Sequence, residues 1–107
     1  MIQLTSTQEL DAQLASKGLV LAYFTTPDCG VCKALKPKLE EVLAIYESIR
    51  AYEIDVAANP DAAGQHSIFT LPGLLVYADG KEYLREARYM SVASIESQLA
   101  RLVSLYN

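Results

Sequence analysis

The feature that most constrains the fold is an almost unbroken apolar run, LVLAYFT, at residues 19–25. Gly18 precedes the run and Thr26-Pro27-Asp28 follows it, so turn-forming residues bound it on both sides. A run without alternating polar side chains is typical of a strand that is buried on both faces. The chain therefore has to supply a covering layer on each side of a sheet, which favours an α/β fold.

The residues after this run change to a helical pattern. Apolar side chains recur at three- and four-residue steps over about five turns. They are Leu35, Leu39, Val42, Tyr46 and Ile49. The pattern predicts a long amphipathic helix that opens at Cys29 and ends near residue 49. Pro37 lies inside this helix and is expected to kink it, because proline lacks the N–H that would bond the carbonyl four residues back.

The other elements follow from caps, turns and shorter apolar patterns. Strands are predicted at 2–4, 51–56, 73–78 and 81–88, the last two joined by a hairpin turn at Asp79-Gly80. Helices are predicted from a Ser6 cap to Gly18, from an Asn59 cap and Pro60 to His66, and from a Ser91 cap onward. The last helix has an expected buried stripe of Val92, Ile95, Leu99, Leu102 and Tyr106. This order implies a single domain, residues 1–107, with helices on both faces of a mixed sheet.

Charge and hydropathy argue against several classes of protein. The formal net charge is −4, whereas nucleic-acid binding needs a basic stripe. No apolar run approaches the roughly 18 residues that span a bilayer, so no membrane association is expected. The first residues show neither a basic segment nor an apolar leader, and a cytoplasmic location is therefore expected.

Two cysteines, Cys29 and Cys32, carry the strongest chemical signal. The nucleophile in disulfide exchange is the thiolate, and Cys29 follows a buried strand and opens a helix. Unpaired backbone N–H groups and the helix dipole therefore favour its ionised form. Cys32 lies one turn later, close enough to attack a mixed disulfide formed at Cys29. The pair predicts a catalytic dithiol in which Cys29 attacks and Cys32 resolves.

Two other interpretations of the pair stay open. A zinc site needs further ligands, and the chain has no other cysteine and a single histidine, His66, so only sharing across a dimer would complete it. No metal is predicted, and His66 is expected to be a solvated surface residue. A buried, inert pair is disfavoured because residues 26–28 and Gly30 indicate a loop at the surface.

Over nearly its whole length the chain resembles the thioredoxin family. The matching segments are Leu21-Ala22-Tyr23-Phe24, Cys29-Gly30-Val31-Cys32-Lys33, Pro37, Ile54-Asp55 with Asn59-Pro60, Leu71-Pro72 and the Asp79-Gly80 turn. The resemblance implies an α/β thioredoxin fold, a central mixed sheet of about four to five strands flanked by about four helices.

The resemblance also implies which residues surround the cysteine pair. A substrate groove would be lined by Asp28, Gly30, Val31, Leu71, Pro72 and Gly73. The Leu71–Pro72 peptide would be cis, and the main chain of Leu71 would pair with a bound substrate. Behind the pair would lie Tyr23, Lys33 and Pro37.

Two residues beside Cys29 depart from the family pattern. Asp28 stands where the family commonly has tryptophan. Its carboxylate opposes ionisation of Cys29 by about 1 kcal/mol at about 4 Å in water, against about 0.3–1 kcal/mol from the helix dipole. We therefore expect a weakly activated thiol, and Asp28 is equally suited to cap the helix. Val31 replaces the usual proline and restores an N–H that could bond the Cys29 sulfur, which favours a more oxidising couple.

Two further departures concern the group that accepts the Cys32 proton and the residues that border the substrate groove. The family's buried aspartate and its lysine partner fall at Tyr23 and Ala51. A tyrosine, with an ordinary pKa of about 10, is a poor base, so either water accepts the Cys32 proton or resolution is slow. Tyr23 would otherwise be a core aromatic with its hydroxyl bonded. Arg88 and Tyr89 stand where the family has a glycine that keeps the groove open, so they should alter which partners fit.

The favoured function is a cytoplasmic, monomeric thiol–disulfide oxidoreductase that reduces or exchanges protein disulfides. Its electrons would come from a thioredoxin-reductase-type donor. The alternative is a thioredoxin-fold binding or redox-sensing module with little turnover, suggested by the altered residues around the pair. No cofactor is predicted, because the chain has neither a G-x-G-x-x-G fingerprint nor a phosphate loop.

Overall fold

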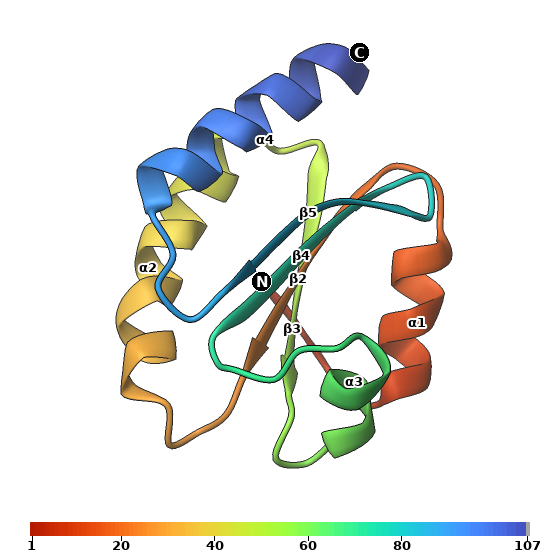
Figure 1. Ribbon diagram of the computed structural model, residues 1–107. Coiled ribbons are helices and arrows are strands. Elements are labelled where there is room, and N and C mark those ends of the chain that lie inside the picture. Colours follow the sequence, from red (N-terminus) through yellow and green to blue (C-terminus); the bar gives the residue numbers. More distant parts are fainter. Residues whose placement is uncertain (107) are drawn as a thin grey trace.

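The structure is a computed structural model that describes residues 1–106 (Figure 1). Its elements are β1 (Ile2–Leu4), α1 (Thr7–Ala15), β2 (Leu19–Thr25), α2 (Gly30–Ile45), β3 (Ile49–Asp55), α3 (Pro60–Gln65), β4 (Gly73–Ala78), β5 (Lys81–Ala87) and α4 (Val92–Tyr106). Within the described chain, the strands form one five-stranded sheet in the order β1-β3-β2-β4-β5. None of the helices in this part of the chain has the length and apolar composition needed to cross a membrane.

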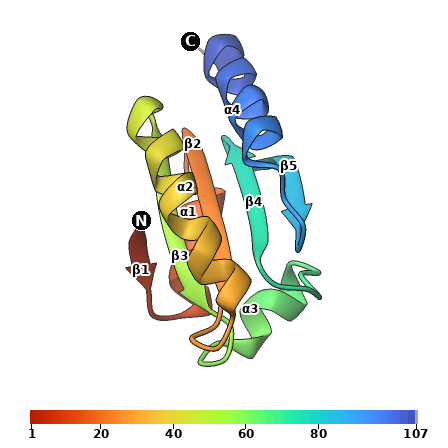
Figure 2. The ribbon, with the colours of Figure 1, turned by 90° about the vertical axis from the view of Figure 1, so that its left-hand side faces the viewer.

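β2 is the central strand, and all of its residues are buried. It pairs with β3 in parallel and with β4 antiparallel, so the sheet is mixed. Its side chains alternate between two hydrophobic clusters, one against α2 and α4 and the other against α1 and α3 (Figures 1 and 2). The first cluster takes Leu19, Leu21 and Tyr23, and the second takes Val20, Ala22 and Phe24. The predicted α/β sandwich is confirmed.

α2 is shorter than its apolar spacing predicts. The helix ends at Ile45, and Ile49 is instead the first residue of β3. Ile49 is buried opposite Leu19 of β2. Backbone pairing with the central strand therefore overrides the helical spacing at this point. Pro37 lies within α2, which continues on both sides of it.

Serine caps open α1 and α4, as predicted. The hydroxyls of Ser6 and Ser91 each accept a hydrogen bond of 3.1 Å from the backbone N–H three residues on. Asn59 occupies the N-cap position of α3 and Pro60 begins the helix, as predicted, but the Asn59 side chain makes no capping hydrogen bond. The Asn59 side-chain amide instead donates to the carbonyl of Asp55, 3.1 Å away, which ties α3 to the end of β3.

The tip of the β4–β5 hairpin joins three segments of the chain. Asp79 and Gly80 have φ values of 50° and 82°, as a two-residue hairpin turn requires. The Asp79 carboxylate accepts hydrogen bonds of 2.8 Å from the N–H of Gly18 and from the Tyr106 hydroxyl. Tyr106 is therefore partly exposed, and the prediction that it belongs to the buried stripe of α4 is wrong. Its hydroxyl holds the end of this helix to the hairpin.

Replacing Gly73 with alanine should destabilise the fold by about 1–3 kcal/mol, the usual cost of overpacking a core. A Cβ at this position would stand 2.5 Å from Cγ2 of Ile68 and 3.4 Å from Cβ of Phe24, and both neighbours are buried. Gly64→Ala is the matched control, because a Cβ there meets nothing within 4 Å and alanine favours a helix. Urea unfolding of the oxidised proteins measures the difference. Equal stability of G73A and wild type would contradict the packing argument.

Candidate functional site

Cys29 and Cys32 are joined by a disulfide where β2 gives way to α2. Cys29 is the N-cap of α2, and its Sγ accepts a hydrogen bond of 3.2 Å from the N–H of Cys32. Cys29 is partly exposed, whereas Cys32 is only 1% exposed. A partner can therefore reach the sulfur of Cys29 but not that of Cys32.

Of two predictions for the residues beside Cys29, the one that Asp28 caps the helix is wrong, and the one for Val31 stays a prediction. Asp28 does not cap α2, because Cys29 occupies that position and Asp28 is exposed. The N–H that bonds the Cys29 sulfur belongs to Cys32 and not to Val31. The disulfide form therefore gives no support to the argument that Val31 makes the couple more oxidising. Val31 is 54% exposed and, next to the exposed Gly30, presents apolar surface beside the reactive sulfur.

The loop that ends at Pro72 lies beside the cysteines. The pairing of Phe24 with Gly73 places Pro72 next to the point where β2 leads into α2. The Leu71–Pro72 peptide is cis, as the resemblance implied, and Leu71 is half-buried. Gly73, expected to line the groove, is instead buried at the start of β4, because its backbone packs closely against Ile68.

Arg88 and Tyr89 form the wall of a neighbouring cavity of about 400 Å³, which Val31 also lines. The N–H of Arg88 donates to the carbonyl of Pro72 at 2.7 Å, and Arg88 has a φ of 64°. Its guanidinium lies 5.0 Å from the centre of the Tyr89 ring, which is largely exposed. The two residues share this cavity with Val31, which follows Cys29 by two positions, and their effect on the choice of partner stays a prediction.

Phe69 is a surface feature that the sequence reasoning missed. Its side chain is 83% exposed in the segment that leads to Leu71 and Pro72. The available signal was an aromatic residue in the short segment between the helix predicted to end at His66 and Pro72. Such connecting segments lie at the surface. Phe69 therefore enlarges the exposed apolar surface near the end of the loop.

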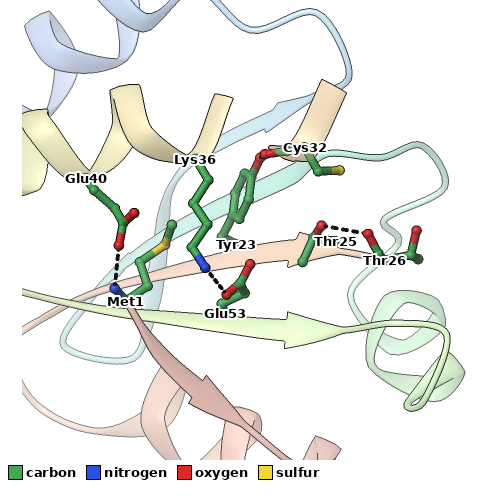
Figure 3. A network of polar contacts seen from close by, with 8 residues as sticks. All are labelled: Met1, Tyr23, Thr25, Thr26, Cys32, Lys36, Glu40 and Glu53. Atoms are coloured by element: carbon green, nitrogen blue, oxygen red, sulfur yellow. Dashed lines mark hydrogen bonds and ion pairs between the residues drawn. The ribbon is translucent and has the colours of Figure 1, made fainter. Parts of the chain in front are cut away.

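Tyr23 lies beside Cys32 (Figure 3). Its side chain is fully buried, and its hydroxyl donates to the backbone carbonyl of Cys32 at 2.7 Å. Burial, with a smaller contribution from the charge of Glu53, raises the pKa of Tyr23 to about 12. The residue is a core aromatic with a bonded hydroxyl, and it keeps its proton at neutral pH.

The remaining predicted residues are placed differently. Lys33 and Pro37 are exposed on α2, and only Lys33 borders the cavity beside Cys32. His66 was expected to be solvated, but its side chain is only 16% exposed, and its Nε2 lies 2.8 Å from the Asp11 carboxylate. Residues 1–106 contain no group of three or more His, Cys, Asp or Glu side chains arranged to hold a metal.

A partly buried ion pair near Cys32 is the largest feature that sequence reasoning missed. Glu53 lies opposite Tyr23 in the β2–β3 register and is 6% exposed. Lys36 Nζ donates to Glu53 Oε1 at 2.8 Å, and this hydrogen bond raises the pKa of the lysine (Figure 3). The available signal was Glu53 itself, an acidic residue inside the strand predicted at 51–56. A charged side chain in an interior strand of a sheet needs a partner.

Comparisons with known proteins agree with this geometry. The thioredoxin family model matches residues 1–103. The thioredoxin-like protein YdfQ of Bacillus subtilis (strain 168) is 39% identical over 84 residues, which is 78% of this chain and 75% of that protein. A thioredoxin of Chlamydia trachomatis serovar D is 36% identical over 85 residues, 79% of this chain and 82% of that protein.

Solved structures share the fold. The thioredoxin of Trypanosoma brucei brucei superposes with a TM-score of 0.89 at 16% identity, covering 97% of this chain and 91% of that one. The oxidised form of mitochondrial thioredoxin 3 from Saccharomyces cerevisiae gives 0.83 at 20% identity, with 94% of each chain covered. At these identities the likeness concerns the fold alone.

Tyr23→Phe should lower the free energy of unfolding by about 1 kcal/mol at neutral pH, because it deletes the hydrogen bond to Cys32. The folded-state pKa of about 12 lies above the ordinary value of 10.0, so the stability that this phenol contributes is complete below pH 10 and is lost as pH rises toward 12. The deficit of Y23F should therefore shrink across that range.

Urea unfolding at a series of pH values tests this behaviour. Tyr83→Phe is the control, since Tyr83 is partly exposed on β5. A Y23F deficit that stays constant from pH 8 to pH 12 would show that the phenol does not carry the alkaline dependence.

Proposed function

The chain belongs to the thioredoxin family and is a thiol–disulfide oxidoreductase, and from this premise we propose that it reduces protein disulfides, with Cys29 attacking and Cys32 resolving. The observation that carries the proposal is the unequal exposure of the two cysteines. Cys29 is accessible at the helix start, while Cys32 is buried one turn behind it.

The reaction proceeds in two exchanges. The Cys29 thiolate attacks one sulfur of a substrate disulfide, so that a mixed disulfide forms and one substrate thiolate leaves. Cys32, after losing its proton, attacks Cys29, which closes the internal disulfide and releases the second substrate thiolate. The substrate gains two electrons and two protons overall, and the protein dithiol is oxidised. The N–H of Cys32 and the N-terminus of α2 stabilise the Cys29 thiolate.

The partners and setting form part of the same proposal. The exposed apolar side chains of Val31, Phe69 and Tyr89 provide a surface on which an unfolded or extended protein segment can dock. Asp28, Gly30 and the main chain of Leu71 border the approach to the sulfur. We place the protein in the cytoplasm as a monomer, where a thioredoxin-reductase-type donor returns the disulfide to the dithiol and sustains electron transport.

Insulin reduction tests the proposal directly. The wild-type protein should precipitate insulin chains in the presence of dithiothreitol, and Cys29→Ser should reduce the rate to that of dithiothreitol alone, because the attacking sulfur is gone. Cys32→Ser should still attack but should accumulate a mixed disulfide, visible as a covalent adduct by non-reducing electrophoresis.

The alternative function gives a different result in this assay. A binding or redox-sensing module would show wild-type turnover no higher than that of the C29S protein, although its disulfide would still form and be reduced. That outcome would overturn the catalytic proposal. Cell fractionation and size-exclusion chromatography test the cytoplasmic and monomeric assignments separately.

Arg88→Gly should widen the approach to Cys29 and increase kcat/KM for insulin. Reduction of a small aromatic disulfide, which needs no groove, should change little. Glycine also adopts a φ of 64° without strain, so R88G should be more stable by up to about 1 kcal/mol. Arg88→Ala separates the two effects, because it removes the bulk but retains the strained backbone. Insulin kinetics unchanged in both variants would show that Arg88 does not limit substrate access.

A further inference from the structure

We propose that Glu53 accepts the proton of Cys32 during the resolving step, through water in the cavity that both residues line. The inference rests on the proposed function, because it concerns the attack of Cys32 on a mixed disulfide at Cys29. It identifies a group for a task that Tyr23, at the position expected from the family resemblance, does not perform.

The cavity provides the path between the two residues. It has a volume of about 250 Å³ and runs between the start of α2 and the ends of β2 and β3. Cys32 and Lys36 line it from α2, and Glu53 and Asp55 line it from β3. One water takes up about 30 Å³ of the liquid, so several water molecules fit between these side chains. A proton can therefore pass from sulfur to carboxylate without direct contact.

Glu53 is held in a geometry that suits an acceptor. Its side chain is almost fully buried, and Lys36 Nζ donates to Oε1 at 2.8 Å. Figure 3 shows the other carboxylate oxygen turned away from Lys36. The lysine positions the carboxylate and leaves that second oxygen for a water molecule. A buried base beside a buried thiol is the arrangement that general-base catalysis requires.

The other ionisable groups around Glu53 are poorly suited to the task. Tyr23 faces it from β2, but this phenol donates to the Cys32 carbonyl, and burial raises its pKa to about 12. Lys33 and Lys36 are cations at neutral pH and cannot accept a proton. Asp55 also lines the cavity, but its carboxylate accepts from the N–H of Ala57 at 2.8 Å and is less buried.

One more ion pair lies on this side of the sheet. The amino group of Met1 is 3.1 Å from the carboxylate of Glu40, so the two charges largely compensate each other (Figure 3). Gln3, which follows in β1 and pairs with Glu53 in register, is neutral. The charges that face Glu53 directly are therefore those of Lys36, Lys33 and Asp55.

The step is balanced within the proposed reaction. The S–H bond of Cys32 breaks, and its proton passes through water to Glu53 as the sulfur attacks Cys29. The bond between Cys29 and the substrate sulfur breaks, and its electron pair leaves with the substrate thiolate. Glu53 then returns the proton to solvent through the open side of the cavity. No external oxidant is needed beyond the substrate disulfide.

The direction in which the rate of resolution changes when Glu53 is neutralised distinguishes a proton acceptor from a carboxylate that only lies near Cys32. A carboxylate that merely lies near Cys32 disfavours the thiolate, so neutralising it would speed resolution or leave it unchanged. A carboxylate that takes the proton speeds resolution, so neutralising it would slow the step. The effect should be largest where the thiol is still protonated and should diminish as the pH rises and more of the thiol ionises.

Stopped-flow reaction of the reduced protein with dithiobis(nitrobenzoic acid) measures the step. The first release of coloured thiolate reports attack by Cys29, and the second reports resolution by Cys32. At pH 7, Glu53→Gln should slow the second release by about ten- to a hundredfold and leave the first unchanged. The difference between the two proteins should narrow as the pH is raised to 9.5. Glu53→Asp, which keeps a carboxylate, should recover part of the rate.

Asp55→Asn is the matched control, since it neutralises the neighbouring carboxylate of the same cavity. A D55N second release as fast as that of the wild type supports the assignment to Glu53. An E53Q rate equal to or above the wild type at pH 7 would overturn it, as would slowing that is uniform at every pH. Melting temperatures of the oxidised proteins show whether each variant is folded.

The same traces separate this inference from the proposed function. Cys32→Ser should give the first release only. If the wild type also gave only one release, Cys32 would not resolve, and the proposed function itself would fail. If the wild type gave two releases and E53Q behaved like it, only the role of Glu53 would fail.

Discussion

Because β2 lies between β3 and β4 with a helical layer on each side, its backbone is paired within the sheet and its side chains are shielded from water on both faces. A shift of the strand by one residue would exchange the side chains that fill the two clusters and disrupt the packing of both. The chain leaves this fixed strand at Thr25 and enters α2 at Gly30. The position of Cys29, at a helix start, and the burial of Cys32 therefore follow from how the sheet is packed.

The same packing determines what could be predicted from sequence. β2, the serine caps, the hairpin turn and the cysteine pair depend on neighbouring residues, so they were predictable. Ile49 was not, because its spacing continues the helix and only pairing with Leu19 places it in a strand. The burial of Gly73 depends on Ile68, which packs against it from the preceding segment. Contacts of this kind arise from tertiary structure, which local patterns do not contain.

Tyr23 and Glu53 show how a buried polar arrangement can change position within a fold. They occupy paired positions on adjacent strands, so a carboxylate on either strand would face the same end of α2. In this chain the Tyr23 hydroxyl donates to the Cys32 carbonyl. The buried carboxylate is that of Glu53 on β3, and its partner Lys36 lies on α2. Every buried side-chain nitrogen or oxygen in the described residues has a hydrogen-bond partner, so the rearrangement leaves no polar atom unpaired.

The hydrogen bonds of Asp79 also have a practical consequence. They hold the last turn of α4 against the hairpin tip, and Figure 1 shows this end of the molecule opposite the point where α2 begins. A surface, a dye or a second protein attached beyond α4 would therefore face away from Cys29. The Cys32→Ser protein, which retains its mixed disulfide, can be immobilised through that end with its reactive sulfur directed toward solution, which makes it suitable for capturing clients from a mixture on a column.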